Sequence, residues 1–148
     1  MVPQQIEREI IIAAPVAQLW AALTAAEHIG AWFGDAGAEI DLQPGGRAVF
    51  RWQGEGAFHA FIERVEPNQV FAYRWAHKAD EQPADGNSTL VEFTLTPDGE
   101  STRLRVVESG FTTLHMTEAE QAKNATMNTQ GWHQELDELR EYAQSLAA

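Results

Sequence analysis

Residues 125–146, ATMNTQGWHQELDELREYAQSL, carry the most regular pattern in the chain. The positions expected to be buried recur every three or four residues, the spacing of one helix face: Ala125, Asn128, Trp132, Leu136, Leu139, Ala143 and Leu146. Polar residues fill the opposite side, at Gln134, Glu135, Asp137, Glu138 and Glu141. The stretch predicts an amphipathic helix about 33 Å long, comparable to the width of a seven-stranded sheet with strands about 4.8 Å apart. One such helix is long enough to cross a whole sheet.

The middle of the chain has the two-residue period that is typical of β-strands. Bulky residues alternate with polar or small ones at 48–52, 70–75, 91–95 and 103–106, and turn residues separate these segments at 44–46, 67–68 and 97–99. Ile62 and Val65 are three positions apart, which indicates a β-bulge between them. The pattern predicts an antiparallel meander in which each strand has one bulky face.

The first third of the chain predicts one strand and two short helices. Residues 5–12 end in three consecutive isoleucines, which favour a pleated surface over a helix. Pro15 suits the first turn of a helix that runs to about Thr24, and a second helical piece at 26–33 ends before Gly34. No repeat or composition shift divides the chain, so we expect a single α+β domain over residues 1–148.

Composition excludes several classes of function. Ten Lys and Arg against 22 Asp and Glu give a formal net charge of −12, which disfavours nucleic acid as a partner of this acidic protein. The absence of cysteine excludes disulfides, thiolate metal sites and a cysteine nucleophile. The five histidines show no metal-binding spacing, so we expect neither a metal nor a cofactor. Charged residues near the start and the short apolar run at 10–17 lead us to expect a cytoplasmic protein without membrane insertion.

The predicted sheet and helix differ in width. A helix about 10 to 12 Å across cannot cover the bulky face of such a sheet, so the sheet must curl around it and the two short helices must close one end. Curling around large rings leaves space, which makes an apolar cavity the leading hypothesis. The same aromatic pattern is also typical of an ordinary core.

Several short motifs occur in the order found in one known family: Leu19–Thr24, Trp32–Phe33, Pro44–Gly46, Val65–Pro67, Tyr73–Trp75, Ser109–Phe111 and Gly131–Trp132. Through them, nearly the whole chain resembles the activator of 90-kDa heat-shock-protein ATPase homologue-like family, within the START-like (SRPBCC) superfamily. The resemblance implies the helix-grip fold, a curved antiparallel sheet of six or seven strands wrapped around a long C-terminal helix. It also implies two short helices after strand one and a hydrophobic cavity.

The expected cavity lining combines the ring-bearing strand faces with motif residues: Trp32, Phe33, Phe50, Trp52, Phe61, Tyr73, Trp75, Phe93, Glu108, Phe111 and Trp132. Glu108 keeps step with the inward face of its strand, although it comes near the strand's end. Gly131 is expected to let the helix approach the sheet closely. Arg74 lies between two rings, so alternation places it on the opposite face, paired with an acidic residue across strands.

Three functions remain as alternatives. The first is the binding of a small apolar or aromatic ligand, such as a lipid. The second, implied by the resemblance, is chaperone binding, although eukaryotic activators carry an additional N-terminal domain that this sequence does not contain. The third is a cyclase or dehydratase acting on a polyketide-like substrate, as in some START-like relatives, with Glu108, Tyr73 or His59 as polar groups. No nucleophile elbow, phosphate loop or dinucleotide motif occurs, so no catalytic residue is assigned and a binding role is favoured.

Overall fold

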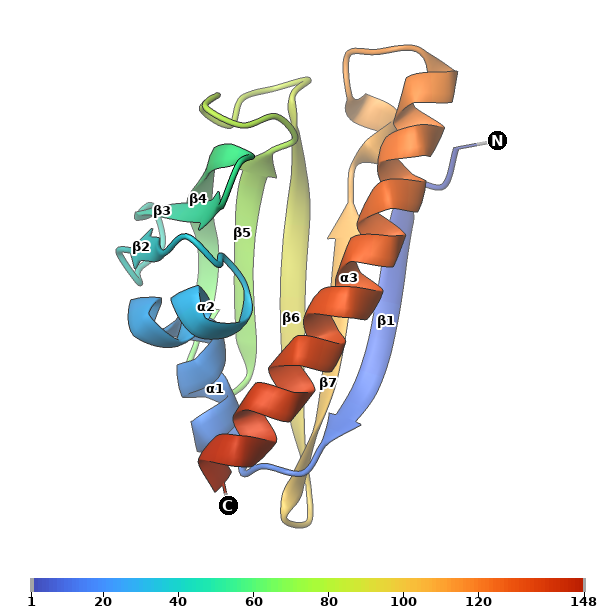
Figure 1. Cartoon of the computed structure of the whole chain (residues 1–148). Helices are drawn as coiled ribbons and strands as arrows, with labels where there is room; N and C mark the ends of the chain where they lie inside the picture. The colour runs from blue at the N-terminus through green and yellow to red at the C-terminus, as the bar shows by residue number, and fades with distance from the viewer. Residues whose placement is uncertain (1, 148) are drawn as a thin grey trace.

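The computed structural model describes residues 2–147 and contains a seven-stranded antiparallel sheet (Figure 1). The strands are β1 (Gln5–Ile12), β2 (Ala38–Ile40), β3 (Arg47–Trp52), β4 (Gly56–Glu66), β5 (Val70–Ala76), β6 (Ser88–Asp98) and β7 (Ser101–Ser109). Their order is β1-β7-β6-β5-β4-β3-β2, so β2 to β7 form a meander and the first strand pairs with the last. The predicted antiparallel meander is confirmed.

Three α-helices and one 3₁₀ turn complete the fold: α1 (Val16–Thr24), α2 (Ala26–Trp32), η1 (Phe111–Thr113) and α3 (Glu118–Ala147). The helix α3 crosses one face of the sheet, packing on β1 and reaching α1 and α2 (Figure 1). The predicted long C-terminal helix and the helix-grip arrangement are confirmed.

The helix α3 begins at Glu118, several residues before the predicted start near Ala125. The reason is a capping box at its first turn. The backbone N–H of Glu120 donates to the Thr117 hydroxyl over 3.2 Å, and the Glu120 carboxylate accepts from the Thr117 hydroxyl and backbone N–H in return. These bonds satisfy N–H groups that a helix otherwise leaves without partners, so they extend the helix by two turns of weakly amphipathic sequence.

The core lies between the sheet and α3, on the strand faces that the alternation predicted. The buried residues are Ala48, Phe50, Phe71, Tyr73, Val91, Phe93, Leu95, Leu104 and Val106 from the sheet, and Trp132, Leu136, Leu139 and Ala143 from α3. The register of β4 against β5 shifts between Ile62 and Arg64, which confirms the predicted bulge. The bulge lets both Ile62 and the later residue Val65 pack against the core.

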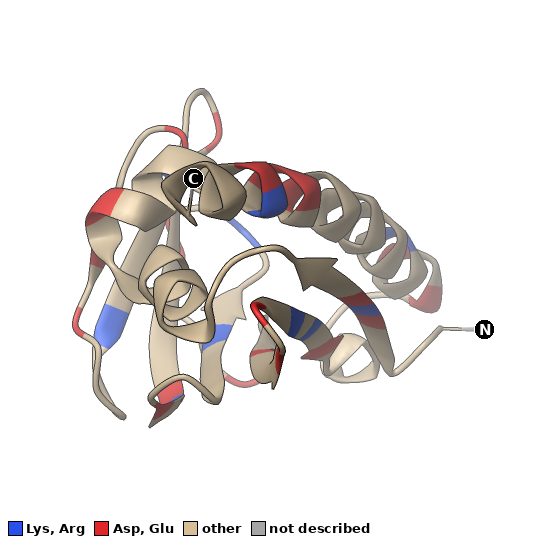
Figure 2. Cartoon of the chain, turned by 90° about the horizontal axis from the view of Figure 1, so that it is seen from below, with Lys and Arg blue, Asp and Glu red and all other residues tan. Residues whose placement is uncertain are grey.

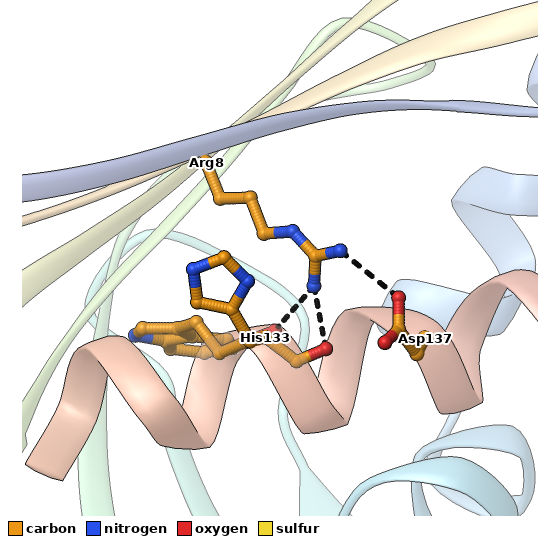
Figure 3. A network of polar contacts seen from close by, with 4 residues as sticks. Arg8, His133 and Asp137 are labelled. Carbon is orange, nitrogen blue, oxygen red and sulfur yellow. Dashed lines mark hydrogen bonds and ion pairs between the residues drawn. The ribbon is translucent and has the colours of Figure 1, made fainter.

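One charged residue on the inner face of β1 fixes the position of α3 (Figure 3). Arg8 alternates in step with Ile6 and Ile10, and its guanidinium donates to the backbone carbonyls of Trp132 and His133 on α3. It also forms an ion pair of 2.9 Å with Asp137. Because hydrogen bonds to charged groups contribute more than neutral ones, Arg8 anchors the middle of the helix to the edge of the sheet.

The outer face of the sheet is covered by ion pairs between neighbouring strands. Arg74 pairs with Glu63 at 3.6 Å, which confirms the expected cross-strand partner, and Arg103 pairs with Glu9 at 3.5 Å. Within residues 2–147, no helix has both the length and the apolar character needed to cross a membrane.

Candidate ligand groove

A groove of about 1000 Å³ lies between α3 and the curled half of the sheet formed by β3, β4 and β5. We call it the α3 groove. Aromatic residues line it at Trp32, Phe33, Trp52, Phe58, Trp75, Trp132 and Tyr142. Acidic residues line it at Asp35, Glu55, Glu135, Glu138 and Glu141, and the remaining lining residues are Ala31, Ala76, His77, Asn124, Met127, Asn128, Gly131, Gln134 and Ser145.

The groove exists because α3 is held away from β3, β4 and β5. The helix is fixed to β1 by Arg8, and its last turns meet the helical corner, where His28 Nδ1 and the Tyr142 hydroxyl are 2.5 Å apart. Gln144 accepts from the backbone N–H of Ala13 over 2.9 Å at the same end. Arg8 and Gln144 thus hold α3 near β1 and the segment that follows it, Tyr142 holds the end of α3 to α2, and side chains line the space between α3 and strands β3, β4 and β5.

Stacked rings form the inner wall of the groove. Phe33 lies parallel to the Trp132 indole, with centroids 5.7 Å apart and an interplanar angle of 9°. Trp75 stacks on both of these rings, at 6.0 Å from Phe33 and 5.9 Å from Trp132. Trp52 meets Phe33 edge to face at 4.8 Å. Such contacts add to the gain from burial, so the wall is held in one arrangement before any ligand arrives.

Behind this wall lies Glu108, whose side chain is fully buried. Its carboxylate accepts from the indole N–H of Trp75 over 3.0 Å and from that of Trp132 over 2.9 Å. The Thr89 hydroxyl donates over 2.5 Å, and the Asn128 amide lies 3.0 Å from both carboxylate oxygens. Two donors come from the sheet and two from α3, so Glu108 joins the two layers and sets the orientation of two groove indoles.

Two further polar groups near the groove have no hydrogen-bond partner in the described part of the chain, the Tyr73 hydroxyl and Oε2 of Glu135. Burial raises the pKa of Tyr73 well above its ordinary value of 10.0, and the charges of Glu108 and Glu135 add to this rise. Burial is also the main cause that raises the pKa of Glu135 to about 8, and the like charge of Glu138 contributes. The carboxyl of Glu135 therefore lacks a counter-charge.

The structure brings together five of the predicted lining residues on the groove surface: Trp32, Phe33, Trp52, Trp75 and Trp132. Phe50, Tyr73 and Phe93 lie behind them in the core, with Glu108. Trp32 also donates its indole N–H to the Ala22 carbonyl over 2.7 Å, so it closes the helical corner as well as lining the groove.

Two predicted lining positions are wrong. Phe61 is 42% exposed on the outer face, because its neighbours Ala60 and Ile62 take the inward positions of β4. Phe111 is buried in a separate small cluster with Leu114 and Ala125, where η1 meets the start of α3.

Three other expectations also need correction. His59 alternates with the inward-facing Phe58, so it lies on the opposite face of β4 and does not converge with Tyr73 and Glu108. Gly131 is not needed for close packing, because an added Cβ would meet no atom within 4 Å. The expected cavity also differs in kind, since the groove is open along one side and its α3 wall is acidic.

Sequence reasoning missed Phe58 and Asn128 as functional residues. Phe58 follows the turn glycines of the β3–β4 hairpin, where alternation had too few residues to set its face, and it contacts Trp52 edge to face at 5.4 Å. The acidic wall was seen only as the solvent side of a helix. The period of α3 does place Glu135, Glu138 and Glu141 on one stripe, and this stripe could have been recognised as a third face.

No group of three or more His, Cys, Asp or Glu side chains within residues 2–147 has the arrangement needed to hold a metal ion. A smaller pocket of about 450 Å³ adjoins the groove at His77 and contains Lys78 and Lys123. The two ends of this surface thus differ in charge.

The fold and the groove define a helix-grip protein of the START-like class. The sequence profile of the family described as activator of Hsp90 ATPase homolog 1-like protein matches residues 13–144, and the chain belongs to this family. No curated protein matches the chain.

Solved structures share the fold over nearly the whole chain. Protein MLL2253 from Mesorhizobium loti is 25% identical with a TM-score of 0.79, and the alignment covers 95% of this chain and 97% of that one. DynU16, from the dynemicin biosynthetic locus, is 21% identical with a TM-score of 0.77, over 98% of this chain but only 49% of its own. PFC0360w, an HSP90 activator from Plasmodium falciparum, is 16% identical with a TM-score of 0.71, covering 91% and 92%.

The contacts of Glu108 lead to a stability prediction. We expect Glu108→Gln to lower the free energy of unfolding by about 2 to 4 kcal/mol. The new amide has the same size, but its NH₂ group must face an indole N–H or the Asn128 amide, all of which are donors. Urea unfolding measures the change, with Glu100→Gln in the exposed β6–β7 turn as the matched control. A loss as small as that of the control would contradict this role.

The raised pKa of Glu135 leads to a pH prediction. The folded chain keeps this proton up to about pH 8, whereas an unfolded chain releases it near 4.5. The group therefore stabilises the fold fully at low pH, and this contribution is lost as the pH rises through 8. The side chain of Glu135→Gln stays neutral at every pH. We therefore expect its free energy of unfolding, relative to that of the parent, to rise by about 2 kcal/mol between pH 5 and pH 8.5. Urea unfolding at both pH values, with Glu100→Gln again as the control, measures it; parallel pH profiles would refute it.

Proposed function

We propose that this protein binds a small, largely apolar, ring-bearing molecule in the α3 groove. The observation that carries the proposal is the inner wall of stacked rings, which borders a groove of about 1000 Å³ and leaves Trp52, Phe58 and Trp75 only half-buried. This volume is within the range of sites for drug-sized ligands, and such sites are lined mainly by aromatic and apolar side chains with a few polar groups. Burial of apolar ligand surface, at about 25 cal/mol per Å², would supply most of the affinity.

Gly131 supports this function. Glycine in the middle of a helix costs about 1 kcal/mol relative to alanine. Packing does not require it here, since a Cβ at this position would meet no atom within 4 Å. Gly131 lines the groove, so its missing side chain leaves the groove wider at this point. A ligand in the groove accounts for a glycine that packing does not require.

Chaperone binding is a second candidate, and the family match favours it, because the family is described by an activator of Hsp90 ATPase. The two functions use different parts of the protein if the groove is reserved for a small molecule. Stimulation of the ATPase of a 90-kDa heat-shock protein by the parent, and equally by Gly131→Leu, would support a chaperone role that does not depend on the groove.

The ligand proposal is tested with N-phenyl-1-naphthylamine, a neutral probe that fluoresces in apolar surroundings. We expect saturable binding at one site per chain and a rise in the melting temperature, because a ligand that binds only the folded state stabilises it. Gly131→Leu places a side chain in the groove and should weaken binding at least tenfold. Gly131→Ala is the control, which should keep binding and gain about 1 kcal/mol in unfolding free energy.

Two results would contradict the proposal. One is the absence of saturable binding to the parent protein. The other is equal affinity in the parent and in folded Gly131→Leu, since the probe would then lie elsewhere on the surface.

A further inference from the structure

The α3 groove has an unbalanced charge. Five carboxylates line it, and none of its lining residues is Lys or Arg. Acidic residues follow one another along the C-terminal half of α3, which forms one side of the groove (Figure 2). The chain as a whole has 22 acidic and 10 basic residues. This excess alone does not explain why five carboxylates line one groove with no Lys or Arg among them.

Acidic residues on the outer face of the sheet, unlike those of the groove, form ion pairs with arginine. There, Glu7 and Glu63 each pair with an arginine on the neighbouring strand, and Glu92 on β6 pairs with Arg64 on β4, across β5. Among the ion pairs of residues 2–147, none involves a groove carboxylate. Asp35 accepts a backbone N–H from Gln53 over 2.8 Å, but it has no cationic partner either. The groove is therefore a place where negative charge is left without a counter-charge.

Glu135 is the most constrained of these carboxylates. It is half-buried, and its Oε2 atom is shielded from solvent without a hydrogen-bond partner. The charges of Glu138 and Asp35 are close enough to disfavour its ionised form further. Because neither Lys nor Arg lines the groove, no cation of the groove lining favours the ionised form of this carboxyl.

The aromatic wall favours the same sign of charge. The faces of indole rings carry negative electrostatic potential and attract ammonium groups, with Trp the strongest of the aromatic residues. Trp52, Trp75 and Trp132 all line the groove, and hydrogen bonding by the Trp52 side chain partly opposes the rise in the pKa of Glu135 that burial causes. Ring faces and carboxylates together attract a cation and repel an anion.

We propose that the α3 groove selects a ring-bearing organic cation, a protonated amine or quaternary ammonium, with its charged nitrogen beside Glu135 and its rings against Trp75 and Trp132. This inference rests on the proposed ligand-binding function and adds the charge of the ligand. The cation would supply the counter-charge that Glu135 lacks, and its binding would favour release of the Glu135 proton. The basic residues Lys78 and Lys123 lie beyond the other end of the groove, at His77, which keeps them away from the ammonium position.

The test compares two probes of the same shape. One is trimethyl(2-naphthylmethyl)ammonium, and the other is its neutral carbon analogue, 2-neopentylnaphthalene. Calorimetry or quenching of tryptophan fluorescence gives both dissociation constants at pH 9 and low ionic strength, where Glu135 is ionised and the quaternary ammonium keeps its charge. We expect the parent to bind the ammonium at least tenfold more tightly than the carbon analogue. In Glu135→Gln this preference should fall below threefold, while Glu100→Gln, which removes the same charge from an exposed turn, should keep it.

Each other outcome overturns a definite part of the account. If the parent binds both probes equally, the inference about charge fails and the proposed binding function stands. If Glu135→Gln and Glu100→Gln keep the same preference, the ammonium responds to the net charge of the protein and not to the groove. If neither naphthalene probe binds, the inference fails, and N-phenyl-1-naphthylamine decides separately whether the binding function fails with it.

Discussion

A single buried carboxylate joins the two layers of this protein. Glu108 lies on β7 with no exposed surface, and it accepts hydrogen bonds from Trp75 and Thr89 on the sheet and from Asn128 and Trp132 on α3. A carboxylate is stable at such a depth only when donors surround it, so the helix cannot rotate or slide without breaking this set. The position of α3, and with it the shape of the groove, depends on that constraint.

The groove follows from how the remaining attachments are distributed. Arg8 holds the middle of α3 to β1, and Tyr142 holds the end of α3 to His28 on α2. Between α3 and strands β3, β4 and β5, the rings of Phe33, Trp75 and Trp132 stack on one another. The fold is therefore tightly packed around Glu108 and open toward the acidic residues of α3 that line the groove.

Most of the architecture could be predicted from the sequence alone. The spacing of the hydrophobic residues shows whether a segment is a strand or a helix and which of its faces is buried. The strand faces, the bulge near Ile62 and the partner class of Arg74 all follow from alternation. The start of α3 was missed because its capping box at Thr117 outweighs weak amphipathicity, and Phe61 was misplaced because a ring was taken as evidence for an inward face. The groove could not be derived, since α2, β3, β5 and α3 contribute to it from distant parts of the chain.

The most direct test observes the indole N–H signals of the five tryptophans by NMR during titration with N-phenyl-1-naphthylamine. Trp20 lies outside the groove, edge to face with Phe71, and serves as an internal reference. The account predicts that the signals of Trp52, Trp75 and Trp132 shift together and saturate, while that of Trp20 stays in place. A shift confined to Trp20, or uniform small shifts of all five signals, would contradict a ligand site between α3 and the sheet.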